Sequence, residues 1–296
     1  MNRRDLLRAT LAVPLLVACK SDEGPESPSP SGPVALQNVG GDAVSGLEIG
    51  DAEEELLQGA RRYAFGLIGQ DGPLAGATAT VYVGTDPEKP PTVTAGAVEL
   101  SEPGLKDRGL YVAQVPFDTA GDYFVAVVAK TKAGALRGGT RVTVKATSKA
   151  PAPGSRAPSF ATPTVSAPLG AKPLCSRRPK PCTMHAVSLD AALRNGKPTV
   201  VVFAAPAFCR TELCGPDVEI LQGVARRHAG KANFIHVEAY RGATNPTDGK
   251  LAPALTKFGF ESEPWLYVID RKGVVSDRIS GAFATTEVEQ RLAAVL

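Results

Sequence analysis

The chain has 296 residues, a formal net charge of +3 at pH 7 and 43% hydrophobic residues. This length fits two modest domains. The nearly balanced charge gives no sign of the basic surface that nucleic-acid binding needs, so we expect no nucleic-acid partner.

Residues 1–18 predict an export signal. Arginines at positions 3, 4 and 8 accompany an apolar run over 6–18 that is too short to span a bilayer. The segment Leu16-Val17-Ala18-Cys19 resembles a bacterial lipobox. The resemblance implies a lipoprotein in which Cys19 is lipidated and anchors an extracytoplasmic protein to the membrane. An ordinary signal with a chance cysteine is the alternative. The Arg3-Arg4 pair also resembles a twin-arginine signal, which exports folded proteins.

Residues 19–46 follow as a tether rich in Ser, Pro, Gly and acids, which cannot bury enough apolar surface to fold. Residues 47–146 then have a β pattern, with short runs rich in Val, Tyr and Phe between Gly, Pro and Asp clusters. The expected strands include 63–67, 77–83, 109–115, 123–129 and 140–144.

The turn at 117–123 resembles one that precedes a late strand in extracytoplasmic Ig-like modules. With six or seven expected strands, this implies a small antiparallel, Ig-like β-sandwich over 47–146. We expect it to act as a spacer or docking module, because it has no cysteine pair and no cluster of histidines or acids.

A linker rich in Pro, Ala and Ser over 147–173 should be extended and semi-rigid. Residues 174–296 then alternate strand and helix, which predicts an α/β domain. The expected helices are 189–194 capped by Ser188, one from about Glu212 to Gly230, 251–258, and a last one opened by a capping box at Thr286 and Glu289. The expected strands are 199–203 and 233–239, with a hairpin over 265–279.

The apolar strand over 199–203 leads directly to Cys209 and Cys214, and Glu263-Pro264-Trp265 precedes the hairpin. These features resemble the thioredoxin-like domain of membrane-tethered thiol–disulfide oxidoreductases. The resemblance implies that Cys209 attacks and Cys214 resolves, with a disulfide-bearing or dithiol protein as substrate and no cofactor. It also implies a cis bond before Pro264 and a substrate-docking surface made by Phe208, Glu263, Pro264 and Trp265.

The spacing of the two cysteines departs from that family, because four residues separate them instead of two. On a regular helix, Cα atoms five residues apart lie about 8.7 Å apart, beyond disulfide range. Either the helix begins late, near Cys214, or its first turn melts on oxidation. Gly215 and Pro216 weaken the helix there and allow both solutions.

Two further departures concern proton transfer and the residue before the first cysteine. Phe208 stands where thioredoxins have Trp, and the buried acid of thioredoxins falls near Val202, which cannot titrate.

The segment 209–214 also resembles that of a peroxiredoxin class with the same cysteine spacing, which makes a peroxidase an alternative. Pro206, however, stands where that class has Thr or Ser.

The other two cysteines, Cys175 and Cys182, are candidates for a structural disulfide, since export leads to an oxidising compartment. A second redox pair is the alternative.

Cys182, His185 and His236 also suggest copper-delivery proteins of the Sco type, which use two cysteines and a distant histidine on this fold. Those cysteines have a different spacing, so we expect His236 in the core and no metal. A non-catalytic lipoprotein with two structural disulfides is the remaining alternative.

Overall fold

The computed structural model describes residues 33–209, 211–243, 245 and 249–296. The expected signal peptide, Cys19 and most of the tether lie outside these residues. Within the described part of the chain, no helix is long and apolar enough to cross a membrane.

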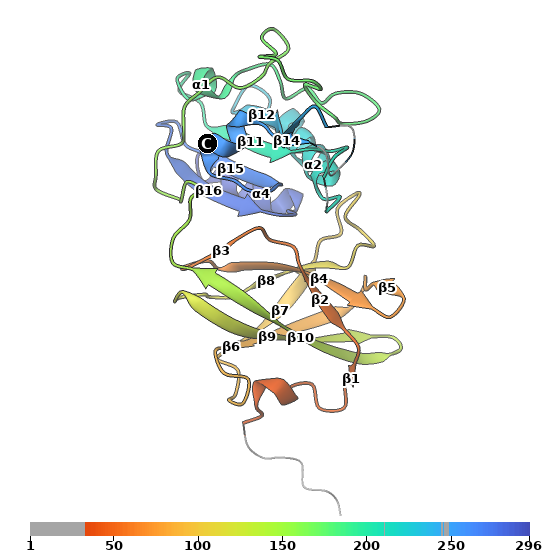
Figure 1. Cartoon of the computed structure of the whole chain (residues 1–296). Coiled ribbons are helices and arrows are strands. Elements are labelled where there is room, and N and C mark those ends of the chain that lie inside the picture. Colours follow the sequence, from red (N-terminus) through yellow and green to blue (C-terminus); the bar gives the residue numbers. More distant parts are fainter. Residues whose placement is uncertain (1–32, 210, 244, 246–248) are drawn as a thin grey trace, which may run out of the picture. The chain divides into compact units, whose positions relative to one another are not determined.

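The first part of the described chain is all-β, as the residue pattern predicts (Figure 1). Ten of the described strands form one sheet in the order β1-β10-β9-β6-β7-β8-β4-β2, with β3 beside β10 and β5 beside β4. The finer assignment to an Ig-like sandwich stays a prediction, because hydrogen bonds join all ten strands into a single sheet. The strands are β1 (Val44–Ser45), β2 (Glu48–Asp51), β3 (Leu56–Leu57), β4 (Arg62–Gly69), β5 (Gly72–Pro73), β6 (Thr78–Gly84), β7 (Val93–Glu99), β8 (Leu110–Gln114), β9 (Gly121–Thr131) and β10 (Gly134–Lys145).

Alternating apolar residues build the core of this β region. In β4 the side chains of Tyr63, Phe65 and Leu67 point inward, as the two-residue period of a strand requires. Tyr63 stacks on Phe65 with ring centroids 5.1 Å apart. The sequence analysis did not predict strand β7, because most of its residues are small and none belongs to a strongly apolar run; in the structure none of them is fully buried.

The second part of the described chain is an α/β region with the sheet order β12-β11-β15-β16. Strand β11 is parallel to β12 and antiparallel to β15, and β15 forms the expected hairpin with β16. A separate short ladder pairs β13 with β14. The strands are β11 (Thr199–Ala204), β12 (Asn233–Glu238), β13 (Tyr240–Arg241), β14 (Lys250–Leu251), β15 (Trp265–Ile269) and β16 (Val275–Ser280).

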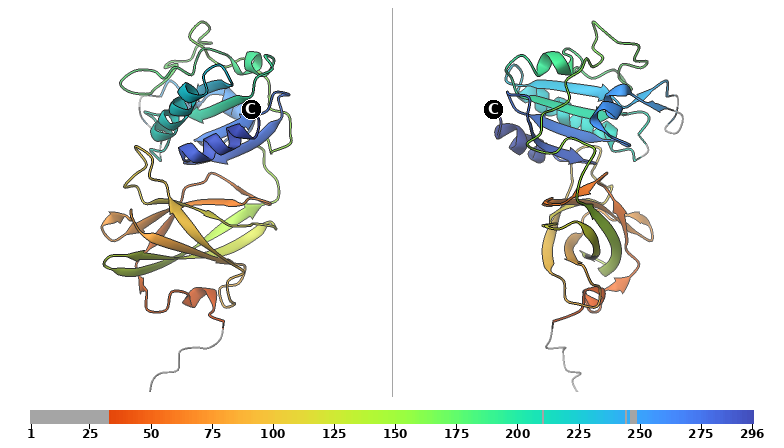
Figure 2. Two further views of the ribbon diagram at one scale, coloured as in Figure 1. Left: turned by 180° about the vertical axis from the view of Figure 1, so that it is seen from behind. Right: turned by 60° about the vertical axis from the view of Figure 1, so that its left-hand side comes forward.

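Helices cover both faces of this sheet (Figures 1 and 2). All six residues of β11 are buried. Val200 and Val202 face the cluster that includes the apolar sides of α2 and α4, whereas Val201 and Phe203 face the cluster of α1 and α3. The helices are α1 (Leu189–Ala192), α2 (Cys214–Arg227), α3 (Pro253–Phe258) and α4 (Thr285–Ala293), and a short 3-10 helix, Leu36–Asn38, precedes β1.

The expected linker is held against the α/β region over part of its length. The amide of Gly154 donates to the Val275 carbonyl, and that of Ala157 donates to the Gly273 carbonyl. Ala150 and Ala157 are buried in the same apolar cluster as α3. This segment therefore has no regular helix or strand and is nevertheless fixed at several points.

The prediction of a capping box at Thr286 and Glu289 is wrong. Helix α4 begins at Thr285, and the Glu287 carboxylate accepts a hydrogen bond from the Ala284 amide. Glu289 instead binds Arg227, the last residue of α2, and His228, which follows it. The sequence spacing predicted that Glu289 would cap the helix, but these tertiary contacts engage its carboxylate.

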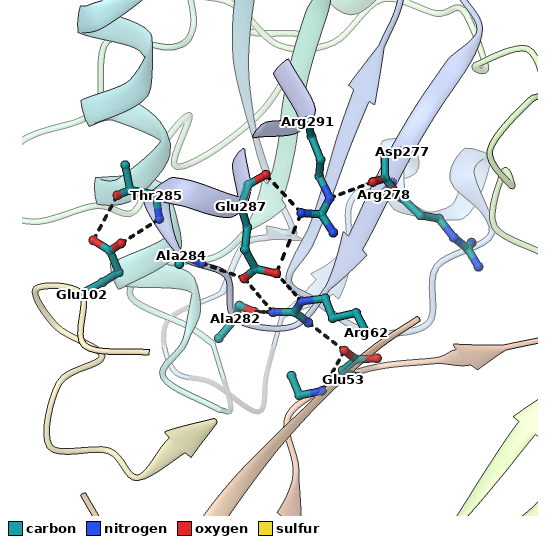
Figure 3. Close-up of polar contacts among 11 residues, drawn as sticks. Glu53, Arg62, Glu102, Asp277, Arg278, Ala282, Ala284, Thr285, Glu287 and Arg291 are labelled. Atoms are coloured by element: carbon teal, nitrogen blue, oxygen red, sulfur yellow. Dashed lines mark hydrogen bonds and ion pairs between the residues drawn. The ribbon is translucent and has the colours of Figure 1, made fainter. Parts of the chain in front are cut away.

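Buried charges connect the β region with α4 (Figure 3). Arg62 of β4 donates to Glu287 at 2.7 Å, to Glu53 at 2.7 Å and to the Ala282 carbonyl. The side chains of Arg62, Glu53 and Glu287 are only 11%, 9% and 17% exposed. Burial raises the pKa of Glu53 to about 7 even though Arg62 opposes the shift.

Two further contacts join the same surfaces. The carboxylate of Glu102 accepts hydrogen bonds from both the amide and the hydroxyl of Thr285. Gly281, with φ of +76°, lies so close to the Ala52 carbonyl that a Cβ there would overlap it, so only glycine allows this approach.

Replacing Arg62 with Met tests how much these buried charges contribute to the stability of the fold. We expect Arg62→Met to lower the free energy of unfolding by about 3–5 kcal/mol, because it leaves the buried Glu53 without its cation and removes the nearer of the two cations that pair with Glu287. The neighbouring Arg61 is a matched control, since its ion pair with Asp118 is 60% and 69% exposed. Arg61→Met should cost no more than about 1 kcal/mol. Denaturant unfolding of the two variants measures both values, and equal losses would contradict this assignment.

Candidate functional site

Cys209 and Cys214, the expected redox pair, lie just beyond the carboxyl end of β11. The chain leaves the strand at Ala204, reaches Cys209 in a turn, and enters α2 at Cys214. Helix α2 therefore begins late, as one of the two solutions to the cysteine spacing requires. Glu212 has a left-handed φ of +58°, which places the chain ahead of Cys214 outside a regular helix. The two sulfur atoms and a Glu263 carboxylate oxygen lie within 4.8 Å of one another.

The start of α2 stabilises a thiolate on Cys209. The amide of Cys214 donates to the Cys209 Sγ at 3.4 Å, and the Thr211 hydroxyl lies 3.3 Å from the same sulfur. The hydrogen bond from the Cys214 thiol is the largest influence on the Cys209 pKa and lowers it to about 6, against the opposing effect of burial. The pKa of Cys214 itself is raised well above its usual value by burial and by the neighbouring Cys209 sulfur. The pair thus combines one acidic thiol with one that keeps its proton.

Asp217 is a buried acid near this pair that the sequence analysis did not identify. It lies one turn into α2 and is fully buried. Burial raises its pKa well above the usual range, and the charge of Cys209 contributes in the same direction. The sequence signal was a carboxylate on the otherwise apolar side of α2 next to Val218.

All four expected docking residues are buried. The Glu263–Pro264 bond is cis, as the resemblance implied. Glu263 accepts a hydrogen bond of 2.5 Å from the Tyr240 hydroxyl and lies beside the two sulfurs. Trp265 stacks on Phe260 with ring centroids 4.7 Å apart, so its indole supports the core. None of the four offers much surface for docking in this conformation.

A loop of the β region reaches the beginning of α2. Arg108 donates to Glu212 at 3.1 Å, and a Cβ at Gly104 would lie 3.1 Å from the Pro216 ring. Leu105 of this loop is fully buried in the apolar cluster that contains both Cys209 and Cys214. Cys209 itself is only 5% exposed.

The second pair of cysteines lies in a different environment from the one expected. Cys175 and Cys182 are free thiols, so the expected disulfide is not formed in this structure. Both sulfurs lie within 3.5 Å of His236 Nδ1, and the Cys182 sulfur also lies 3.2 Å from His185 Nε2. We call these four buried residues the Cys2His2 cluster: Cys175, Cys182, His185 and His236.

Hydrogen bonds link this cluster to the redox cysteines. The amide and hydroxyl of Ser176, next to Cys175, donate to Glu238 at 2.7 and 2.9 Å. The same hydroxyl accepts a bond of 3.1 Å from the Ala207 amide, two residues before Cys209. The loop that presents Cys209 is thus fixed in part by the segment that holds the second cysteine pair.

Comparison with protein-family models and with curated proteins finds no match. Among solved structures, the chain is similar to a thiol:disulfide interchange protein DsbE from Chlorobium tepidum, with 18% identity and a TM-score of 0.31 over 49% of this chain and 98% of that one. A second thiol:disulfide interchange protein, of the thioredoxin family and from Chlorobium tepidum TLS, has 22% identity and a TM-score of 0.30 over 49% and 99% of the two chains. CopC from Methylosinus trichosporium OB3b has 14% identity and a TM-score of 0.24 over 34% and 94%. Likeness at this level assigns no activity, and the reasoning about the site rests on its own geometry.

The acidity of Cys209 can be measured directly. We expect the ultraviolet absorbance of its thiolate to appear as pH rises through about 6, whereas an ordinary cysteine titrates near 8.5. The signal is the difference between the reduced protein and Cys209→Ser. Thr211→Val should raise the midpoint by removing the hydroxyl, and Thr211→Ser should leave it unchanged. A midpoint near 8.5 in the unmodified protein would contradict the assignment.

Proposed function

We propose that the protein is an extracytoplasmic, lipid-anchored thiol–disulfide oxidoreductase in which Cys209 attacks and Cys214 resolves. The observation that supports it best is the late start of α2, which aims the Cys214 amide at the Cys209 sulfur and keeps both sulfurs within 4.8 Å. A pair five residues apart can then form a disulfide without unwinding a helix. Lipidation at Cys19 would hold the domain at the membrane.

The first chemical step uses the acidic thiol. The Cys209 thiolate attacks one sulfur of a substrate disulfide, so that a mixed disulfide forms and the substrate S–S bond breaks. The departing substrate thiolate takes a proton from water. Because the pKa of Cys209 is about 6, most of this thiol is ionised at neutral pH and needs no separate base.

The second step requires Cys214 to lose its proton. Its thiolate then attacks the Cys209 sulfur, the Cys209–Cys214 bond forms, and the second substrate sulfur leaves as a thiol. Two electrons pass from the cysteine pair to the substrate, and a dithiol reductant would restore the pair. With a dithiol substrate the same steps run in reverse. Asp217 is the buried carboxyl near this pair, and because burial raises its pKa well above the usual range we assign it the exchange of this proton.

Access to Cys209 requires movement, since only 5% of this residue is exposed. The loop over residues 100–109 contacts the start of α2 through Arg108 and Gly104 and is the element that we propose to be displaced. Glu263 lies beside the sulfurs and, together with the cis Pro264 that follows it, would then contact the substrate chain.

The peroxidase alternative has less support. The hydrogen bonds that lower the pKa of Cys209 come from Cys214, Thr211 and backbone amides. In the peroxiredoxin class with this cysteine spacing, a Thr or Ser three residues before the attacking cysteine orients the peroxide, and Pro206 stands at that position here.

Trapping in cells tests the proposed roles. Cys214→Ser should accumulate mixed disulfides on Cys209, because the resolving thiol is absent, and Cys209→Ser/Cys214→Ser should accumulate none. Non-reducing gels and mass spectrometry identify the adducts. Absence of adducts, together with a Cys209–Cys214 potential below about −300 mV, would show a structural disulfide instead. Peroxide that consumed the Cys209 thiol at catalytic rates would favour the peroxidase.

Replacing Asp217 tests the second step separately. We expect Asp217→Asn to slow release of a preformed mixed disulfide by about 100-fold, because proton exchange at Cys214 is impaired. The first step, measured as Cys209 adduct formation, should change little. Asp190→Asn, at a partly exposed carboxyl of α1, is the control. Equal release rates in Asp217→Asn and Asp190→Asn would remove Asp217 from the mechanism.

A further inference from the structure

The Cys2His2 cluster has the composition and closeness of a metal site. Its four ligand atoms lie within 4.8 Å of one another, and all four residues are buried. Zn–S and Zn–N bonds of about 2.3 and 2.0 Å arranged tetrahedrally place sulfur and nitrogen ligands about 3.5 Å apart. Cys182 lies 3.2 Å from His185 and 3.4 Å from His236, and Cys175 lies 3.5 Å from His236. The side chains therefore need only small shifts to surround one ion.

Hydrogen bonding orients His236 as a ligand. Its Nε2 lies 3.1 Å from the carbonyl oxygen of Ala204, which can only accept, so Nε2 carries the proton. In the neutral ring the lone pair is then on Nδ1, the atom that faces both sulfurs. A carbonyl that fixes the far nitrogen of a ligating histidine is the usual outer-shell arrangement of protein metal sites.

The backbone supports the remaining ligands. The Cys182 amide donates to the Cys175 sulfur at 3.4 Å, and the His236 amide donates to the Met184 carbonyl at 2.8 Å. Arg177 closes the loop between the two cysteines by donating to the Lys180 carbonyl at 2.8 Å. The loop is thus held in a shape that brings its two thiols together without a covalent bond.

The same geometry disfavours a Cys175–Cys182 disulfide. A disulfide has neither an S–H group to donate to His236 Nδ1 nor a negative charge to keep that nitrogen protonated. It would leave a buried acceptor without a partner, which costs about 1–3 kcal/mol. A metal ion held by the two thiolates would instead take up the lone pair of His236 Nδ1.

We propose that the Cys2His2 cluster binds one Zn²⁺ ion through all four side chains. Charge favours Zn²⁺ over Cu⁺, because two thiolates and two neutral imidazoles balance a divalent ion and leave a buried negative charge with a monovalent one. With four protein ligands no position remains for water or substrate, so the ion has a structural role. Through Ser176 and Ala207 it would fix the loop that presents Cys209.

Metal content of the full chain, purified under reducing conditions, tests the proposal. We expect one Zn²⁺ per chain by elemental analysis. Loading with Co²⁺ should produce a thiolate-to-cobalt charge-transfer band and the intense visible bands of tetrahedral coordination. His185→Gln and Cys182→Ser should lose both signals. Two controls should retain them: Cys209→Ser/Cys214→Ser, and His228→Gln, which replaces a histidine bound to Glu289 outside the cluster.

A measurement on the unmodified chain covers the case in which cluster variants fail to fold. Zn²⁺ should abolish alkylation of Cys175 and Cys182 and leave Cys209 reactive. Mass spectrometry of the peptides measures the alkylation of each cysteine. Metal lost in Cys209→Ser/Cys214→Ser, or cysteines alkylated equally with and without Zn²⁺, would overturn the proposal. Preferential retention of Cu⁺ when both ions are supplied would overturn the choice of zinc.

Discussion

Strand β11 is hydrogen-bonded along both edges, to β12 and to β15, and all six of its side chains are buried. This central position connects both cysteine clusters. Its carboxyl end leads to Cys209, its Ala204 carbonyl orients His236 of β12, and its pairing with Trp265 brings the cis Pro264 to the same end. A change that shifted β11 by one residue would exchange its two buried faces and separate both clusters.

The two clusters use sulfur in chemically different ways. Around Cys209 the donors are a helix amide, a hydroxyl and a second thiol, which stabilise one thiolate and leave it free to react. Around Cys175 and Cys182 the neighbours are imidazoles, which are metal ligands. The bridge from Ser176 to Ala207 joins the two, so a metal ion in one cluster would restrict the loop that carries the nucleophile of the other.

The β region contributes more than the spacer expected from its composition. Arg62 lies between Glu53 and Glu287 with little solvent around it, and Glu102 binds the first residue of α4. Such a buried arrangement is stable only while all partners are present, because each charge loses its hydration on burial. The loop that includes Gly104 and Arg108 adds a contact at the start of α2, next to the redox cysteines. The proposed access to Cys209 therefore depends on contacts between the two regions.

Local patterns in the sequence predicted the β region and most α/β elements, because alternation and helical periodicity are properties of neighbouring residues. The cis bond before Pro264 followed from the family resemblance, and the redox roles of Cys209 and Cys214 rest on the same resemblance. The cysteine spacing even restricted α2 to a late start or a melting first turn. Tertiary structure decided the rest. Helix α4 begins at Thr285, where Glu287 and Glu102 accept hydrogen bonds from the Ala284 and Thr285 amides. Asp217 is buried close enough for the charge of Cys209 to affect its pKa only once α2 is packed. His236 meets Cys175 and Cys182 only because parallel pairing with β11 brings a residue more than fifty positions away beside their loop. Contacts between residues so distant in sequence depend on the packed chain and leave no periodic signal in it.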